Sequence, residues 1–160
     1  PSEVVDGGRG TCIDLALLVA SCLEYVEIYP ALVILKTHAF PAYWRFEQYH
    51  KDFMKVTEAA ATAAVAGRDA DRSSAPTAQR DGWYLDRSQY REILNAINSG
   101  RLVPLETTQL TQRGSFAEAI EEGTRNLGSG REFEAFMDIA RARTDPLRSV
   151  TPLPIRRTEA

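Results

Sequence analysis

The strongest constraint on the fold is a glycine-rich turn that runs directly into an apolar helical pattern between Gly8 and Leu18. The stretch reads Gly-Arg-Gly-Thr-Cys-Ile-Asp-Leu-Ala-Leu-Leu. Apolar residues then recur at helical spacing up to Tyr25, which predicts a first helix largely buried in the core. Thr11, followed three residues later by Asp14, is a variant of the capping box that begins helices. The first helix is therefore expected to start at Thr11, directly after a turn of the backbone.

Cys12 places a thiol at the amino end of this helix. Unpaired backbone N–H groups and the helix dipole favour negative charge there, so such a thiol ionises more readily and becomes a better nucleophile. Cys22 follows ten residues later within the apolar stripe, about 15 Å further along a helix, which is too far for a disulfide. We expect Cys22 to be a small core residue. Two unpaired thiols are typical of a reducing compartment, and we expect the cytoplasm.

Three short apolar runs predict the strands of a small antiparallel sheet, at 31–36, 39–46 and 101–106. Pro41 cannot donate a ladder hydrogen bond, so its strand is expected at an edge or beside a bulge. The expected fold is α+β, with a buried N-terminal helix packed on a small antiparallel sheet and peripheral helices around it. The peripheral helices are expected at 47–66, 86–98, 115–127 and 132–143, and a polar loop at 107–114.

The domain organisation follows from length and local composition. A chain of 160 residues suits one domain, which we expect over residues 1–145. Residues 67–81 are rich in Arg, Asp, Ser, Ala and Pro, which predicts a mobile insert in that domain. Residues 146–160 are expected to be a proline-containing tail or linker. The sequence does not begin with Met, so we expect a piece of a longer protein whose other domains are its partners.

The composition argues against several classes of function. The net charge is −3 and the isoelectric point is about 5.5, so no nucleic-acid partner is expected. No apolar run approaches the roughly 20 residues that cross a bilayer, so no membrane partner is expected. Metal-ligand spacings, a P-loop and a dinucleotide fingerprint are also missing from the sequence. We therefore predict neither a cofactor nor a metal.

His38 can complete a nucleophilic site with Cys12, because it falls between two predicted strands. A cysteine nucleophile needs a base that holds the thiolate and later protonates the leaving group. The imidazole in turn needs an orienting acid, and Glu106, at the end of the third strand, is the best-placed candidate. The other histidine, His50, lies in a charged stretch and is predicted to be a surface residue.

Three strings follow one another in an informative order along the chain. They are Gly-Thr-Cys-Ile-Asp-Leu-Ala, Pro-Ala-Leu-Val-Ile-Leu-Lys-Thr-His-Ala-Phe and Leu-Val-Pro-Leu-Glu-Thr-Thr. The sequence thereby resembles the transglutaminase-like superfamily, in which a Cys opens the central helix, a His begins one strand, and an acid, usually Asp, follows in the next. The resemblance covers about residues 8–46 and 100–120. The segment after residue 100 is also similar to modules embedded in larger bacterial proteins, whereas the insert at 47–99 is longer than is usual in the family.

The resemblance implies a papain-like core with Cys12 as nucleophile, His38 as base and Glu106 as acid. Gly10 and Thr11 would shape the oxyanion site. The implied chemistry is thiol-dependent acyl transfer on an amide bond of a protein or peptide, in the first instance peptide or isopeptide hydrolysis by a cysteine protease. Transglutamination and deamidation use the same triad and stay open. A non-catalytic interaction domain of a larger protein is the alternative from another class.

Overall fold

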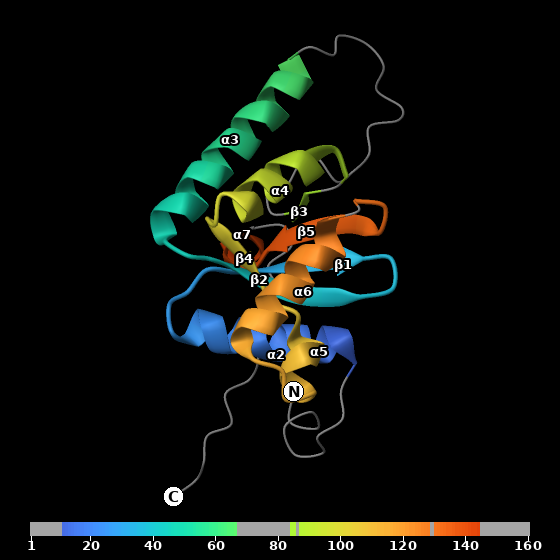
Figure 1. Cartoon of the computed structure of the whole chain (residues 1–160). Coiled ribbons are helices and arrows are strands. Elements are labelled where there is room, and N and C mark those ends of the chain that lie inside the picture. The colour runs from blue at the N-terminus through green and yellow to red at the C-terminus, as the bar shows by residue number, and fades with distance from the viewer. Residues whose placement is uncertain (1–10, 67–83, 86, 129, 145–160) are drawn as a thin grey trace, which may run out of the picture.

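The computed structural model describes residues 11–66, 84–85, 87–128 and 130–144. The predicted insert at 67–81 and the predicted tail at 146–160 lie outside these residues. Element labels follow Figure 1. The helices are α2 (Cys12–Tyr25), α3 (Glu47–Ala66), α4 (Tyr90–Asn98), α5 (Thr107–Thr111), α6 (Phe116–Gly128) and α7 (Ile139–Thr144). The strands are β1 (Pro30–Leu35), β2 (Ala39–Trp44), β3 (Tyr84–Leu85), β4 (Leu102–Pro104) and β5 (Phe133–Asp138).

The α+β prediction is confirmed, and the sheet is antiparallel with strand order β3-β5-β1-β2-β4. The three predicted strands correspond to β1, β2 and β4, which are neighbours in it. The prediction of an edge or bulge at Pro41 was wrong, because β2 lies between β1 and β4. The Pro41 carbonyl accepts the Leu105 N–H at 2.8 Å, just beyond the end of β4. The Pro41 nitrogen, which has no hydrogen to donate, points to the same side. Because β4 ends at Pro104, no residue of β4 needs a hydrogen bond from Pro41, and the proline is tolerated.

Helices cover both faces of the sheet (Figure 1). On one face, α3, α4 and α6 enclose a large apolar core centred on Phe40, Trp44 and Phe136. On the other face, α2 and α7 pack over Leu32 of β1. Ala16 of α2 belongs to this smaller core, and its short side chain lets the helix approach the sheet closely.

The prediction that the first helix is largely buried was wrong, because α2 buries only a narrow stripe. Ala16 and Ala20 are its buried residues, whereas Leu17 keeps 43% of its surface exposed. Cys22 is exposed and is therefore not the core residue that its apolar neighbours predicted. The helix covers the sheet from outside, and its buried stripe packs against Leu32 and Ile139, so its outer half stays at the surface.

The helix predicted at 132–143 was also wrong, because β5 occupies its first half and only α7 is helical. Phe133 and Phe136 lie in the same core although they are three residues apart, a spacing typical of a helix. A register shift opposite Ile34 and Leu35 explains this, because it leaves Glu134 as an extra, exposed residue in the strand. A strand with a bulge thus imitates helical periodicity.

Other helical boundaries agree better with the sequence. The helix at 47–66 is confirmed as α3. The capping box that opens α6 is present, because Ser115 N–H donates to Glu118 at 2.6 Å and Glu118 N–H donates to the Ser115 hydroxyl at 3.2 Å. The polar loop predicted at 107–114 contains α5 instead.

Candidate active site

The pairing of β2 with β4 brings His38 and Glu106 together. Ala42 faces Pro104 in the register, so continuing the ladder by two residues places Glu106 opposite Phe40. His38 is two residues further along the β2 side, in the diagonal position whose side chain shares the same face. The His38 Nε2 lies 2.6 Å from the Glu106 Oε2. The contact expected from the sequence is therefore present, and the long segment between the two residues does not disturb it.

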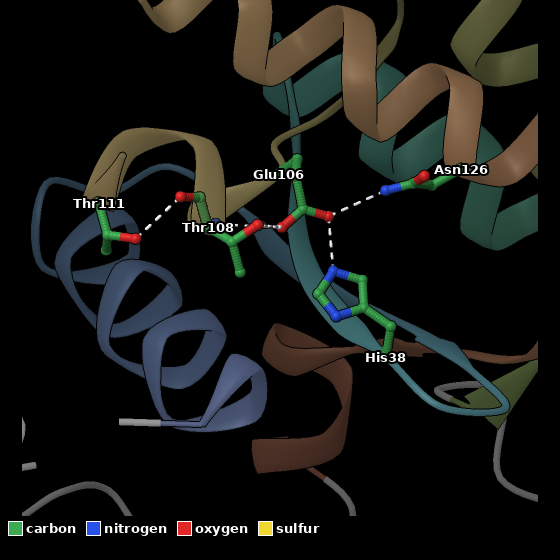
Figure 2. Close-up of polar contacts among 5 residues, drawn as sticks. All are labelled: His38, Glu106, Thr108, Thr111 and Asn126. Atoms are coloured by element: carbon green, nitrogen blue, oxygen red, sulfur yellow. Dashed lines mark hydrogen bonds and ion pairs between the residues drawn. The ribbon is translucent and has the colours of Figure 1, made fainter. Parts of the chain in front are cut away.

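Glu106 is almost completely buried, with 1% of its surface exposed, and is surrounded by donors (Figure 2). Its Oε1 accepts the Thr108 backbone N–H at 3.1 Å and the Thr108 hydroxyl at 2.8 Å. Its Oε2 accepts from the Asn126 amide at 3.0 Å as well as from His38. An ionised carboxylate is the form that accepts from all of these groups. The same side chain caps α5, which begins directly after it.

The donor set fixes the tautomer of His38. Because the carboxylate only accepts hydrogen bonds, the proton of a neutral His38 ring must lie on Nε2. Nδ1 then carries a free lone pair and can accept a proton. Figure 2 shows Nδ1 turned away from Glu106. The pair therefore presents an oriented base to whatever group lies on the other side of the ring.

Cys12 is the first residue of α2, and its thiol is free and half-buried. Thr11 caps the helix, since its hydroxyl oxygen accepts the Asp14 backbone N–H at 3.5 Å, and the Thr11 N–H donates in return to the Asp14 carboxylate at 2.9 Å. The Thr11 amide is thus already engaged, whereas the Cys12 N–H belongs to the helical amides without an intrahelical partner. Gly10, the other residue expected at an oxyanion site, lies outside the described residues. Across the ranges that the structure describes, the Cys12 thiol makes no hydrogen bond with His38.

The topology directs Cys12 toward the His38 end of the sheet. Residues 26–29 join the end of α2 to the start of β1, and α2 packs on β1 and β2. Because the connection is short, α2 must run back along β1 in the opposite direction. A helix of 14 residues and a strand of 6 are both about 20 Å long. The beginning of α2 therefore lies near the end of β1, and His38 occupies the turn that follows. Helix α2 covers the Leu32 face of the sheet, whereas the His38 ring lies beside Phe40, at 5.8 Å between ring centroids, so Cys12 can meet the imidazole only around the end of the sheet.

The prediction that His50 is a surface residue was wrong, because 8% of it is exposed. Its Nε2 lies 2.9 Å from the Asp138 Oδ2, although the two groups are not aligned as a hydrogen bond. The ring stacks on Tyr29 at 4.7 Å between centroids. Asp138 faces Ala31 at the opposite end of the β1–β2 hairpin from His38. His50 therefore belongs to a separate, buried pair that joins α3 to β5.

Thr108 and Asn126 both donate hydrogen bonds to Glu106, and the sequence analysis identified neither of them. The hydroxyl of Thr108, two residues after an acid at a helix start, is a recognisable local pattern. No sequence pattern indicates the role of Asn126, because its contact with Glu106 depends on how α6 packs.

Within the described ranges, no three His, Cys, Asp or Glu side chains are grouped to hold a metal ion. No helix in that part of the chain combines the length and apolarity needed to cross a membrane.

The chain was compared with protein-family models, curated proteins and solved structures, and no match was found.

Proposed function

We propose that this chain catalyses thiol-dependent acyl transfer on amide bonds, with Cys12 as nucleophile, His38 as base and Glu106 as the orienting acid. The observation that carries the proposal is the 2.6 Å contact between His38 and buried Glu106, at the end of the sheet toward which the topology directs Cys12. A papain-like core of the transglutaminase-like type belongs to the same proposal. The expected substrate is a protein or peptide, and two free thiols favour a reducing compartment such as the cytoplasm.

In the first half of the reaction, the Cys12 thiol gives its proton to Nδ1 of His38. The thiolate sulfur then attacks the amide carbonyl carbon, and the Cys12 N–H is one donor available to the resulting oxyanion. As the C–N bond breaks, the imidazolium returns the proton to the leaving amine. The product is a thioester on Cys12. Glu106 holds the ring and stabilises its positive charge without taking the proton.

In the second half, His38 removes a proton from water, which attacks the thioester. The C–S bond breaks, the acid product leaves, and the proton returns to the thiolate. We place hydrolysis first because water needs no second binding site. An amine in place of water gives a crosslink, and a glutamine side chain as substrate gives deamidation. The absence of a hydrogen bond between Cys12 and His38 in the described residues favours the second candidate, a non-catalytic interaction domain.

The test is the alkylation of Cys12 by iodoacetamide at pH 6, followed by peptide mapping. Cys22 is exposed and lies on the same helix, so it serves as an ordinary thiol within the same molecule. We expect Cys12 to react at least about 10-fold faster than Cys22, since an activated thiol is already partly ionised at this pH. His38→Ala should remove the difference. Equal rates for the two cysteines, unchanged by His38→Ala, would reject the proposed nucleophile.

A further inference from the structure

Helix α6 approaches the backbone of Glu106 unusually closely. The Glu106 N–H donates to the Ala119 carbonyl of α6 at 2.9 Å. Gly123 lies one turn later, and a Cβ added there would sit 3.2 Å from the backbone of Pro104 and 3.3 Å from the Glu106 nitrogen. Residues four apart share one face of a helix, and both of these small residues are buried. The absence of larger side chains at these two positions is what allows the contact.

Asn126 follows Gly123 by three residues and therefore lies on the same face of α6. Its short side chain reaches the Glu106 Oε2 at 3.0 Å. That oxygen also accepts from His38, so it lies between the two donors (Figure 2). Thr108 holds only the other oxygen, Oε1. The carboxylate is thus held by its own helix cap on one side and by a separate helix on the other.

We propose that Asn126 is a positioning residue, which fixes the carboxylate plane of Glu106 and so orients His38 for Cys12. The terminal torsion of a glutamate is soft, and Thr108 alone leaves the carboxylate free to swing about Oε1. Asn126 removes that freedom and keeps a lone pair of Oε2 directed at the ring. This inference rests on the proposed function of the His38–Glu106 pair. It extends the candidate active site to α6, a helix that carries none of the site residues predicted from the sequence.

Two substitutions test the proposal. Asn126→Asp keeps the shape but places a second carboxyl group about 3 Å from Glu106, and two carboxylates at this distance share one proton, so the Glu106 oxygen that faces His38 no longer carries its full negative charge. Asn126→Leu keeps roughly the volume and removes the donor. Asn98→Asp makes the same chemical change at an exposed position of α4 and is the matched control. Each variant is analysed as the full chain, after its circular dichroism and thermal transition have shown that it is folded.

Two measurements are made on each variant. The first is the Cys12 alkylation rate relative to Cys22 at pH 6, which we expect to fall by about 10- to 100-fold in both Asn126 variants, because small misplacements of a site cost rates of this order. The second is the NMR signal of the His38 Nε2 proton, which a carboxylate bond shifts downfield and protects from exchange with water. We expect this signal to be lost or broadened in both Asn126 variants and kept in Asn98→Asp.

The two proposals can fail separately. If Cys12 reacts no faster than Cys22 in the unmodified protein, the proposed function fails, and the Nε2 proton signal still decides the role of Asn126. If the unmodified Cys12 is activated and both Asn126 variants keep its rate and the signal, the positioning role is overturned. A loss of both readouts in folded Asn126 variants, with an unchanged Asn98→Asp control, supports it.

Discussion

Glu106→Gln removes one charge from the site and preserves the shape of the side chain. The Thr108 backbone N–H cannot become an acceptor, so we expect the glutamine oxygen to stay at that position. The glutamine NH₂ group then faces His38 and Asn126. The Asn126 amide can flip to accept from it, and His38 can accept at Nε2 if its proton moves to Nδ1. The variant therefore satisfies its hydrogen bonds only when His38 carries its proton on Nδ1, and in this tautomer Nδ1 cannot act as the base.

The magnitude follows from the distance between the lost charge and the ring. The 2.6 Å contact places the centres of carboxylate and imidazolium about 4 Å apart, where unit charges interact by about 4 kcal/mol at an effective dielectric constant near 20. His38 keeps 25% of its side-chain surface exposed, so solvent screening reduces this value, and we take about 2 kcal/mol as the lower bound. The imidazolium that stabilises the thiolate is weakened accordingly. Cys12 reactivity at pH 6 should fall by about 30- to 1000-fold.

Stability should change far less than reactivity, because the variant keeps its hydrogen-bond partners and no longer buries a charge. We expect a loss of about 1 kcal/mol, or about 3 °C in the thermal midpoint. The assay compares Cys12 with Cys22 by alkylation and peptide mapping, and nitrogen NMR reports which ring nitrogen of His38 carries the proton. A folded Glu106→Gln variant that alkylates at the unmodified rate would refute this reasoning. So would a variant that unfolds outright, since Glu106 would then be chiefly structural.

Four further predictions concern packing and pH. Gly123→Ala should destabilise the protein by about 1 to 2 kcal/mol in urea unfolding, because its methyl group meets fixed backbone at 3.2 Å. Gly128→Ala, on the same helix with nothing within 4 Å, should instead stabilise by about 0.5 to 1 kcal/mol. His50→Ala should lower the unfolding free energy by roughly 3 kcal/mol, because the buried Asp138 carboxylate loses the neighbouring imidazole and keeps the Arg141 backbone N–H. Hydrogen bonds from the Ser115 backbone N–H and then its hydroxyl lower the pKa of Glu118 below 4.5. The stability gained from this carboxylate is therefore present above pH 4.5 and lost as the pH falls through the lowered folded value; Ser115→Ala should move the NMR titration of Glu118 back toward 4.5.

The part of the site carried by strands could be predicted from the sequence. The runs that became β1, β2 and β4 are apolar and short, and each is bounded by turn residues. Once β2 pairs with β4, the register alone decides that Glu106 approaches His38. The length of the chain between them is irrelevant, because the intervening helices α3 and α4 pack on one face of the sheet without interrupting the ladder. The register between β2 and β4, and not the number of residues between them in the sequence, determines the contact of His38 with Glu106.

Features that depend on one element packing against another could not be predicted. His50 has charged neighbours, yet its own side chain points inward to Asp138, which is 88 residues away in the sequence. The spacing of Phe133 and Phe136 imitates a helix because a bulge in β5 places both in one core. Asn126 is one polar residue among many on α6 until the close approach at Gly123 brings it to Glu106. In each case the deciding partner is distant in sequence.

The length of the Glu106 side chain follows from its two tasks. One oxygen folds back to cap α5 through the Thr108 N–H at 3.1 Å, while the other reaches His38 at 2.6 Å. An aspartate is shorter by one C–C bond, about 1.5 Å. It could still cap α5, as aspartates commonly do, but its second oxygen would then end about 4 Å from the His38 nitrogen, beyond hydrogen-bond range. The longer side chain is therefore what allows a helix cap and a histidine partner to share one carboxylate.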